Sequence, residues 1–225
     1  PSKPVQFLYA GKAHPNDGGG LDLIKRIYEI SQMPQFTGKI IFLDNYDIEL
    51  AKQLVRGVDI WLNTPIRLLE ASGTSGEKAV MNGTLHYSVL DGWWVEGYHA
   101  FAGWALPQKP TFDNQDLQDD VDAETIYNML EYEIIPAFYS YNEQGIPVEW
   151  ISYIKNSMAK IAPEFTMKRQ IDEYFDKYYN KLWERNKKIA GDNFEKAREI
   201  AAWKKKMTEE WDKIEVLNYK FEKPP

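Results

Sequence analysis

The sequence predicts an α/β protein, with a parallel sheet in its first half and helices in its second. Three short apolar runs, residues 5–10, 39–44 and 58–63, have the length of buried strands. Segments with apolar residues at helical spacing separate these runs, and such alternation is typical of a doubly wound parallel sheet. We therefore expect a Rossmann-like half over residues 1–119 and a helical extension over residues 120–225.

The elements of the first half follow one another closely. The strand at 5–10 is followed by a glycine-rich loop at 16–20 and by a helix with apolar residues at helical spacing, Leu21, Ile24, Ile27 and Ile30. After the second strand, a helix is predicted over about 47–55. The third strand leads into the segment 70–83, and a further strand-like run covers 85–90.

The ends of these strands are where a ligand is expected. In open α/β sheets the binding crevice lies beyond the carboxyl ends of the strands. The residues to examine are therefore those just after each strand: Gly11 and Lys12, Asn45 and Tyr46, Asn63 onward to Glu70, and Asp91 with Gly92.

The segment 70–83 reads Glu-Ala-Ser-Gly-Thr-Ser-Gly-Glu-Lys-Ala-Val-Met-Asn-Gly. It predicts a loop that opens a helix, with Thr74 or Ser75 as the helix cap. Gly73 and Gly76 leave the backbone uncovered, so the first-turn N–H groups and the helix dipole favour an anion there, most simply a phosphate. Lys78 would contact that anion as an ammonium or form a Schiff base, and spacing alone leaves both roles open.

The spacing of the residues in segment 70–83 is, by itself, also compatible with a simpler interpretation. Gly, Ser and Thr before a helix most often form a well-capped turn, and the lysine behind them is then solvated. A nucleotide-binding P-loop is not formed, because it needs Gly-Lys followed by Ser or Thr. Gly11-Lys12 is followed by Ala13, and Lys78 follows Glu77.

The second half of the sequence predicts helices, and we assign no catalytic or binding residues to it. Prolines and a run of Asp, Asn and Gln over residues 103–120 predict a surface connection. Helices are expected over 123–139 and 147–161, and aromatic stripes at helical spacing continue from Ile171 to Leu182 and from Ile200 to Ile214. Such stripes are typical of packing surfaces, and Lys204-Lys205-Lys206 indicates a solvated face.

Composition narrows the class of function. The 225 residues, 44% of them hydrophobic, are enough for a full core. A net charge of −7 argues against a nucleic acid or an anionic membrane as partner. There is no cysteine, and three scattered histidines lack ligand spacing, so no metal site is expected. Without a signal peptide or an apolar run of membrane length, a cytoplasmic location is expected.

The segment 70–83, continued by residues 88–94 (Ser-Val-Leu-Asp-Gly-Trp-Trp) and 96–98 (Glu-Gly-Tyr), resembles the signature of the α-glucan (glycogen/maltodextrin) phosphorylases. The shorter bacterial and archaeal branch is the most similar. Two further blocks, 4–15 and 41–51, match in order, and so do parts of the helical tail at 133–139 and 162–169. The resemblance therefore covers essentially the whole chain.

The resemblance implies a reaction and a cofactor. Members of this family hold pyridoxal 5'-phosphate as a Schiff base on the lysine that matches Lys78. The phosphate of that cofactor relays a proton, so that inorganic phosphate attacks a terminal α-1,4 linkage of the glucan and releases glucose 1-phosphate with retained configuration. Crowded anions of this kind require cations and helix N–H groups around them.

The same resemblance assigns the remaining site residues. Lys12 matches the lysine that contacts the substrate phosphate, and Tyr46 matches a tyrosine beside the cofactor. The backbone of Thr74 and Ser75 matches the cradle of the cofactor phosphate. The sugar would be held by the carboxylate of Glu70 and by the backbone N–H groups of two residues, Ser72 and Gly73.

The resemblance also implies a larger enzyme. The family has two Rossmann-like domains facing across a cleft, the type-B glycosyltransferase fold, and this chain resembles only the later part of the second. We therefore expect the N-terminal domain of the same enzyme as a partner, no activity from this chain alone, and an exposed apolar sheet edge that favours a homo-oligomer.

Two other functions are compatible with parts of the pattern. A nucleotide-sugar glycosyltransferase of the glycogen-synthase type has the same two-domain fold but does not need an imine-forming lysine at the position of Lys78. A non-catalytic glucan-binding module would need neither Lys78 nor Lys12, and would present exposed aromatic side chains to the sugar.

Overall fold

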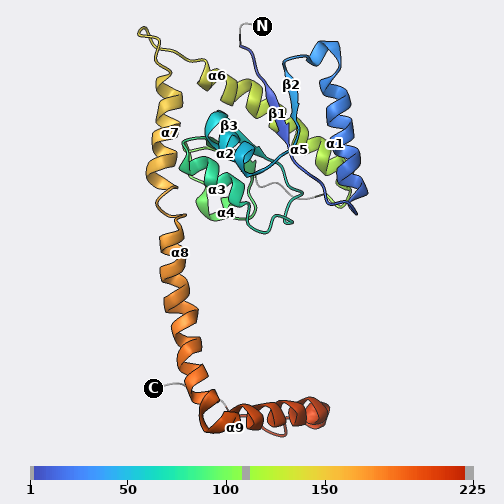
Figure 1. The fold of residues 1–225 in the computed structure, drawn as a ribbon, viewed down its shortest axis with the longest axis vertical. Helices are drawn as coiled ribbons and strands as arrows, with labels where there is room; N and C mark the ends of the chain where they lie inside the picture. The colour runs from blue at the N-terminus through green and yellow to red at the C-terminus, as the bar shows by residue number, and fades with distance from the viewer. Residues whose placement is uncertain (1–2, 108–111, 221–225) are drawn as a thin grey trace. The chain divides into compact units, whose positions relative to one another are not determined.

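The computed structural model describes residues 3–107 and 112–220, and these divide into two compact units, with the boundary between Thr166 and Met167. The first unit is mixed α/β and the second is helical (Figure 1). The predicted alternation of strands and helices in the first half is confirmed.

Among its described residues, the first unit contains five strands, which all run parallel to their neighbours. Its first elements are β1 (Phe7–Ala10), α1 (Gly18–Ser31), η1 (Pro34–Phe36), β2 (Ile40–Leu43), α2 (Ile48–Gly57) and β3 (Ile60–Asn63). They are followed by α3 (Thr74–Met81), β4 (Leu85–Val89), α4 (Trp94–Gly97) and β5 (Trp104–Leu106). Four helical segments complete it: α5 (Gln115–Met129), the π-helical turn η2 (Leu130–Ile134), α6 (Ile135–Phe138) and α7 (Val148–Lys160).

The strands form two sheets where one was expected. β1 pairs with β2, in the register Phe7 to Ile40, and β3, β4 and β5 form a separate sheet in that order. In the described part of the chain no ladder joins β3 to β1 or β2, so the expectation of one sheet containing residues 5–10, 39–44 and 58–63 is wrong. Four-residue apolar runs specify that a strand forms, but they do not specify which neighbour it pairs with.

The core is built around the three-stranded sheet. Leu85, Tyr87 and Val89 of β4 point to one face and pack with residues of β5, α6 and α7, as the strand period of two requires. The opposite face is covered by a second cluster that includes Val80 of α3 and Trp94 of α4. Every residue of β4 and β5 is buried, which is the usual state of a parallel strand with helices on both faces.

The surface connection expected over residues 103–120 is largely wrong. Trp104–Leu106 is the buried strand β5, and α5 begins at Gln115, where Asn114 caps the helix by accepting from the N–H groups of Asp116 and Leu117. A three-residue strand next to Gly103 and Pro107 is too short to give a periodic signal in the sequence. Residues 108–111, including Pro110, lie outside the described part of the chain.

The first strand is less buried than its composition predicts. Leu8 and Tyr9 of β1 are each 40% exposed, whereas a continuous apolar run in a parallel sheet predicts burial on both faces. Exposed apolar side chains on the sheet were expected, and Leu62 of β3 is a further example. Self-association through this surface stays a prediction.

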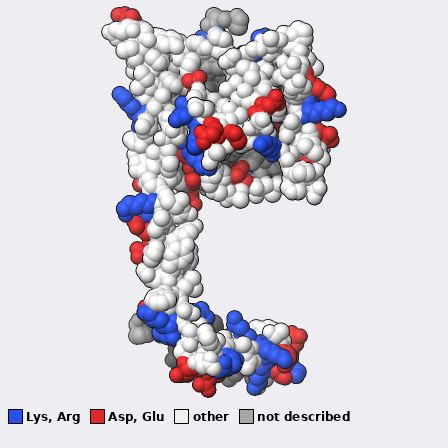
Figure 2. Space-filling view, viewed as in Figure 1, with Lys and Arg blue, Asp and Glu red and all other residues white. Residues whose placement is uncertain are grey.

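The second unit consists of α8 (Met167–Tyr174), the π-helical turn η3 (Phe175–Tyr179), α9 (Asn180–Glu210) and η4 (Trp211–Lys213). Helix α9 is interrupted by non-helical backbone from Gly191 to Phe194. Lys and Arg alternate with Asp and Glu over this unit, and no single sign of charge dominates the face in view (Figure 2). Among the described residues, no helix has the length and apolar character to span a membrane.

Candidate functional site

Helix α3 begins differently from the prediction. Its cap is Gly73, in the left-handed conformation at φ 84° and ψ 39°, and Thr74 and Ser75 are the first helical residues. The expectation that Thr74 or Ser75 caps the helix is therefore wrong. Glycine adopts this backbone without the steric cost that a Cβ would impose, and the helix start has no side-chain cap. The hydroxyl of Ser75 instead accepts a hydrogen bond from Nε1 of Trp61 at 3.2 Å.

The first turn of α3 has the features of an anion site. The N–H groups at the start of a helix have no acceptor within the helix, and they lie at the positive end of its dipole. Lys78 is exposed on the next turn of the same helix. An exposed primary amine beside backbone N–H donors fits a ligand that carries both an aldehyde and a phosphate.

The start of α3 rests on the sheet through Gly76. A Cβ at this position would lie 2.5 Å from Cε1 of His86, a buried residue of β4. The imidazole packs against the rings of Trp93 and Trp94, at centroid distances of 5.2 and 4.7 Å. Burial lowers the pKa of His86 to about 4, and the nearby Trp61 backbone offsets part of that effect. The helix start is therefore supported by a neutral aromatic side chain.

Glu70 is positioned by the turn that follows β4. The backbone N–H of Glu70 donates to Oδ2 of Asp91 at 3.0 Å, and the N–H of Gly92 donates to Oδ1 of the same carboxylate at 2.8 Å. The N–H of Trp93 donates to the carbonyl of Ser72 at 2.8 Å. Asp91 thus joins the loop after β3 to the loop after β4.

Gly92 permits this close contact between the two loops. Its φ is 55°, and a Cβ there would lie 2.5 Å from the Ser72 carbonyl oxygen and 2.9 Å from Cγ of Glu70. The Glu70 carboxyl also lies beside Gly73, 3.6 Å from the position of a Cβ on that glycine. The structure therefore brings together the three residues expected to hold a sugar: Glu70, Ser72 and Gly73.

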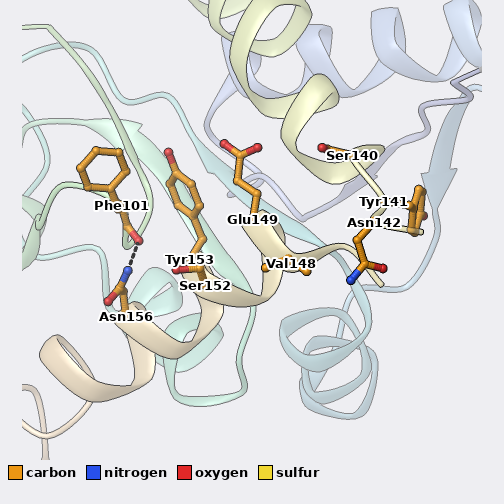
Figure 3. Close-up of a pocket in the computed structure, with 9 residues that line it drawn as sticks. All are labelled: Phe101, Ser140, Tyr141, Asn142, Val148, Glu149, Ser152, Tyr153 and Asn156. Atoms are coloured by element: carbon orange, nitrogen blue, oxygen red, sulfur yellow. Dashed lines mark hydrogen bonds between the residues drawn. The ribbon is translucent and has the colours of Figure 1, made fainter. Parts of the chain in front are cut away.

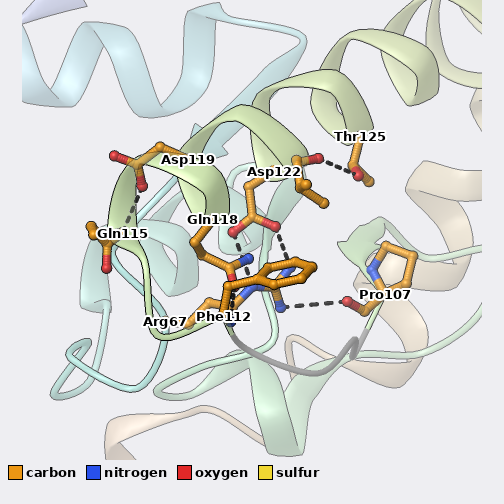
Figure 4. Close-up of polar contacts among 9 residues, drawn as sticks. Arg67, Pro107, Phe112, Gln115, Gln118, Asp119, Asp122 and Thr125 are labelled. Atoms are coloured by element: carbon orange, nitrogen blue, oxygen red, sulfur yellow. Dashed lines mark hydrogen bonds and ion pairs between the residues drawn. The ribbon is translucent and has the colours of Figure 1, made fainter.

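A buried ion pair holds the loop before Glu70. Nε and Nη2 of Arg67 donate to the two carboxylate oxygens of Asp122, at 2.9 and 2.6 Å, and Nη1 donates to the carbonyl of Pro107 at 3.4 Å (Figure 4). The side chains of Arg67 and Asp122 are only 9% and 18% exposed. The Glu70 loop is thereby tied to helix α5 by a bidentate contact.

Lys12 and Tyr46 follow the strands of the two-stranded sheet. They follow β1 and β2, whose carboxyl ends lie at the same edge because Ala10 pairs with Leu43. Lys12 is exposed and Tyr46 is half-buried. In residues 3–107 and 112–220, no hydrogen bond or ion pair joins either of them to the segment from Glu70 to Lys78. Their place in a common site stays a prediction.

The sequence did not reveal every residue that shapes this segment. Asp91 and Gly92 were among the strand-end residues expected near the ligand, but the sequence assigned them no role in holding the Glu70 loop. Arg67 and Asp122 are separated by 55 residues, and no local pattern indicates that they pair. His86 sits inside an apolar strand run, where its type alone gives no sign of its contact with Gly76.

Comparisons with known proteins agree with the motif. The sequence profile of the family described as carbohydrate phosphorylase matches residues 2–102. Maltodextrin phosphorylase of Thermococcus litoralis is 44% identical over 216 residues, which is 96% of this chain and 25% of that protein. Residues 2–102 belong to the carbohydrate phosphorylase family.

Other phosphorylases give the same result. Glycogen phosphorylase of Aquifex aeolicus is 48% identical over 183 residues, covering 80% of this chain and 26% of the relative. Glycogen phosphorylase of Mycobacterium bovis is 37% identical over 216 residues, covering 96% and 25%. The chain thus corresponds to a portion of a phosphorylase, and it spans about a quarter of the length of the curated relatives it matches.

Proposed function

We propose that this chain is part of an enzyme that cleaves terminal α-1,4-glucosidic bonds with inorganic phosphate and releases glucose 1-phosphate. One observation carries the proposal: the Glu70–Lys78 segment forms the loop and first turn of α3, in a chain 44% identical over 216 residues to a maltodextrin phosphorylase. The arrangement fits the pyridoxal 5'-phosphate that the phosphorylase resemblance implies. When bound, that cofactor would supply a phosphate group that relays a proton and is not itself transferred.

The residues of the segment have separate tasks. Lys78 fixes the cofactor covalently, and the N–H groups of Thr74 and Ser75 hold its phosphate through the positive end of α3. Glu70 accepts hydrogen bonds from hydroxyls of the terminal glucose. The N–H groups of Ser72 and Gly73 donate to the same sugar.

The positions of these groups are maintained by their neighbours. Asp91 and Arg67 hold the Glu70 loop through the contacts described above, so that the carboxylate needs little reorganisation on binding sugar. Lys12 contributes a positive charge for inorganic phosphate, and Tyr46 lies beside the cofactor. The reaction requires that the charged groups of the site are shielded from water, and this requires an opposing domain on the other side of the cleft.

The larger architecture is also part of the proposal. Residues 1–119 form the cofactor- and phosphate-binding part of a Rossmann-like domain, and residues 120–225 form its helical extension. The opposing domain of a type-B glycosyltransferase fold holds the glucan acceptor. The small parallel sheets and the length of the relatives support this interpretation.

Cofactor attachment tests the proposal directly. The chain is incubated with pyridoxal 5'-phosphate, reduced with borohydride, digested and analysed by mass spectrometry. We expect a pyridoxyl-phosphate adduct on Lys78 and its loss in Lys78→Ala. Lys160→Ala, an exposed lysine at the end of α7, serves as the matched control. Labelling of several lysines without preference for Lys78 would contradict the assignment.

Activity is tested in the full-length protein that contains these residues, by release of glucose 1-phosphate from maltodextrin. Lys78→Ala should abolish release. Glu70→Gln should slow it about ten- to hundredfold, because a charge-assisted hydrogen bond contributes about 1.5–3 kcal/mol. Near-normal turnover by Lys78→Ala would overturn the proposed mechanism.

A further inference from the structure

The first turn of α3 lies directly on two aromatic rings. A Cβ at Gly76 would lie 2.5, 2.8 and 2.9 Å from Cε1, Nε2 and Nδ1 of His86. A Cβ at Gly73, the residue that caps the helix, would lie 3.2 Å from Cδ1 of Trp93. The two rings pack on each other, with centroids 5.2 Å apart. The N–H of Gly76 donates to the carbonyl of Gly73 at 3.1 Å, so each end of this hydrogen-bonded turn contacts one ring.

The imidazole of His86 is buried against Gly76 in an unfavourable state. The residue is 1% exposed, and among the described residues neither ring nitrogen forms a hydrogen bond. The backbone of Trp61 approaches the ring and opposes part of the fall in its pKa, but the geometry is not that of a hydrogen bond. An apolar side chain would fill the space without leaving two buried nitrogens unpaired, which is unfavourable. Unpaired buried groups in a native protein call for an explanation, and close contact with the start of α3 supplies one.

The segment before β5 also holds His86 in place. A Cβ at Gly103 would lie 2.6 Å from the carbonyl oxygen of His86, so the two backbones are in close contact. At the start of this segment, the carbonyl of Phe101 accepts a hydrogen bond from Nδ2 of Asn156 on α7, at 3.1 Å (Figure 3). The strand β4 and the segment before β5 therefore leave the imidazole little freedom to move away from Gly76.

The contact with His86 determines where the start of α3 lies. Its first-turn N–H groups hold a phosphate only when they point at the same place. Alanine is ordinarily more favourable than glycine within a helix. At position 76, however, the added methyl group would meet the imidazole, and because the ring is held, the first turn would have to move. A side chain at position 76 should therefore misdirect the N–H groups of Thr74 and Ser75.

We propose that His86 is a positioning residue for the cofactor phosphate, acting through Gly76 on the first-turn N–H groups of α3. The inference rests on the proposed function, in which Thr74 and Ser75 hold that phosphate. His86 contributes the size and fixed position of its ring. Burial lowers its pKa to about 4, so it adds no positive charge at neutral pH. The attraction for the anion then comes from the start of the helix and from Lys78.

Two aldehydes test the inference on the 225-residue chain: pyridoxal 5'-phosphate, and pyridoxal, which lacks the phosphate. Each is titrated into the chain and reduced with borohydride, and labelled Lys78 is quantified by mass spectrometry. Gly76→Ala should raise the concentration of pyridoxal 5'-phosphate that gives half-maximal labelling about ten- to hundredfold, because charge-assisted hydrogen bonds to the phosphate are lost. His86→Ala should raise it about three- to tenfold, since the turn loses its support without a clash. The value for pyridoxal should not change in either variant.

Removal of the imidazole should reverse the effect of the added methyl group. In the double variant Gly76→Ala/His86→Ala the methyl group no longer meets the ring, so labelling should be no weaker than in His86→Ala alone. The double-mutant cycle measures this coupling. Gly57→Ala is the control, because Gly57 is also helical and no atom lies within 4 Å of the position of its Cβ. Circular dichroism verifies that each variant is folded, and His86→Ala gives the comparison of the two aldehydes independently of Gly76→Ala.

The outcomes separate the role of His86 from the proposed function. Unchanged labelling by pyridoxal 5'-phosphate in His86→Ala overturns the inference, as do equal losses for the two aldehydes or additive losses in the double variant. In each of these cases selective labelling of Lys78 in the parent chain leaves the proposed function standing. If Lys78 of the parent chain is not labelled selectively, the proposed function is contradicted and the role of His86 is overturned with it.

Discussion

The two sheets of the first unit are built from similar short apolar strands, yet they differ in how completely they are covered. Every residue of β4 and β5 is buried, whereas Leu8 and Tyr9 of β1 are exposed to a considerable degree. Helices pack on both faces of the β3–β4–β5 sheet, through two hydrophobic clusters. The comparison shows that burial of a parallel strand depends on the helices around it more than on its own composition.

The candidate site residues follow strands of both sheets. Glu70 lies in a loop that Asp91 and Arg67 hold, and Lys78 lies on α3, which packs against the covered sheet. Lys12 and Tyr46 follow strands of the two-stranded pair, and two strands alone are marginally stable in water. Glu70 and Lys78 are therefore positioned by elements that pack on the core. Lys12 and Tyr46 are positioned by a two-stranded sheet that is more exposed.

The largest effect should come from breaking the buried ion pair on the covered side. Arg67→Ala removes the bidentate contact to the largely buried Asp122 carboxylate, and breaking such a pair costs about 3–5 kcal/mol. Lys52→Ala is the control, because the Lys52–Glu49 pair on α2 is exposed and such pairs contribute about 0.2–1 kcal/mol. Urea unfolding measures both changes. Equal losses in the two variants would contradict the assigned role of burial.

Core truncations compare the two sheets directly. Leu85→Ala in β4 removes a fully buried side chain and should destabilise the protein by about 2–5 kcal/mol. Leu8→Ala in β1 removes a side chain that is already 40% exposed, so we expect about 1 kcal/mol. The same unfolding experiment measures the ratio. A cost for Leu8→Ala as large as that for Leu85→Ala would mean that β1 is covered in solution.

The sequence predicted the local features of the first unit, but it did not predict the contacts between distant residues. The strands were placed within two residues of their observed limits, because each apolar run is bounded by Gly, Pro or polar residues. The loop and helix of the Glu70–Lys78 segment followed from local composition in the same way. Strand order, the short strand β5 and the Arg67–Asp122 pair could not be predicted, since each depends on residues far apart in the chain. The cap at Gly73 was missed because Thr74 and Ser75 are themselves good capping residues.

The buried imidazole on the covered side should make stability depend on pH. His86 has a pKa of about 4 in the folded protein and about 6.5 when unfolded, so between these values only the unfolded chain binds the proton. Its contribution to unfolding free energy should be constant above pH 7 and fall by about 3 kcal/mol as pH drops from 6.5 to 4.

The measurement is a set of urea unfolding curves at several pH values for the parent chain and for His86→Gln. The unfolding free energy of the parent minus that of the variant should fall by about 3 kcal/mol as pH drops through this window, because the variant lacks only the imidazole of His86. A constant difference between pH 7 and pH 4 would show that His86 is not held in its neutral form by burial.

The smallest effect concerns the attachment of the two-stranded pair. The hydroxyl of Tyr139, at the end of α6, donates to the carbonyl of Pro4 at 2.6 Å, and this bond ties the segment before β1 to a residue 135 positions away. Tyr139→Phe should cost about 0.5–1.5 kcal/mol. Hydrogen exchange resolves where that loss is felt, because local opening reports the stability of each region separately. We expect exchange to accelerate about two- to tenfold at Leu8 and Ile41, with no change at Tyr87. Equal acceleration in both sheets would mean that they open as one unit, and the contrast between a covered and an uncovered half would then be a difference of exposure without a difference of stability.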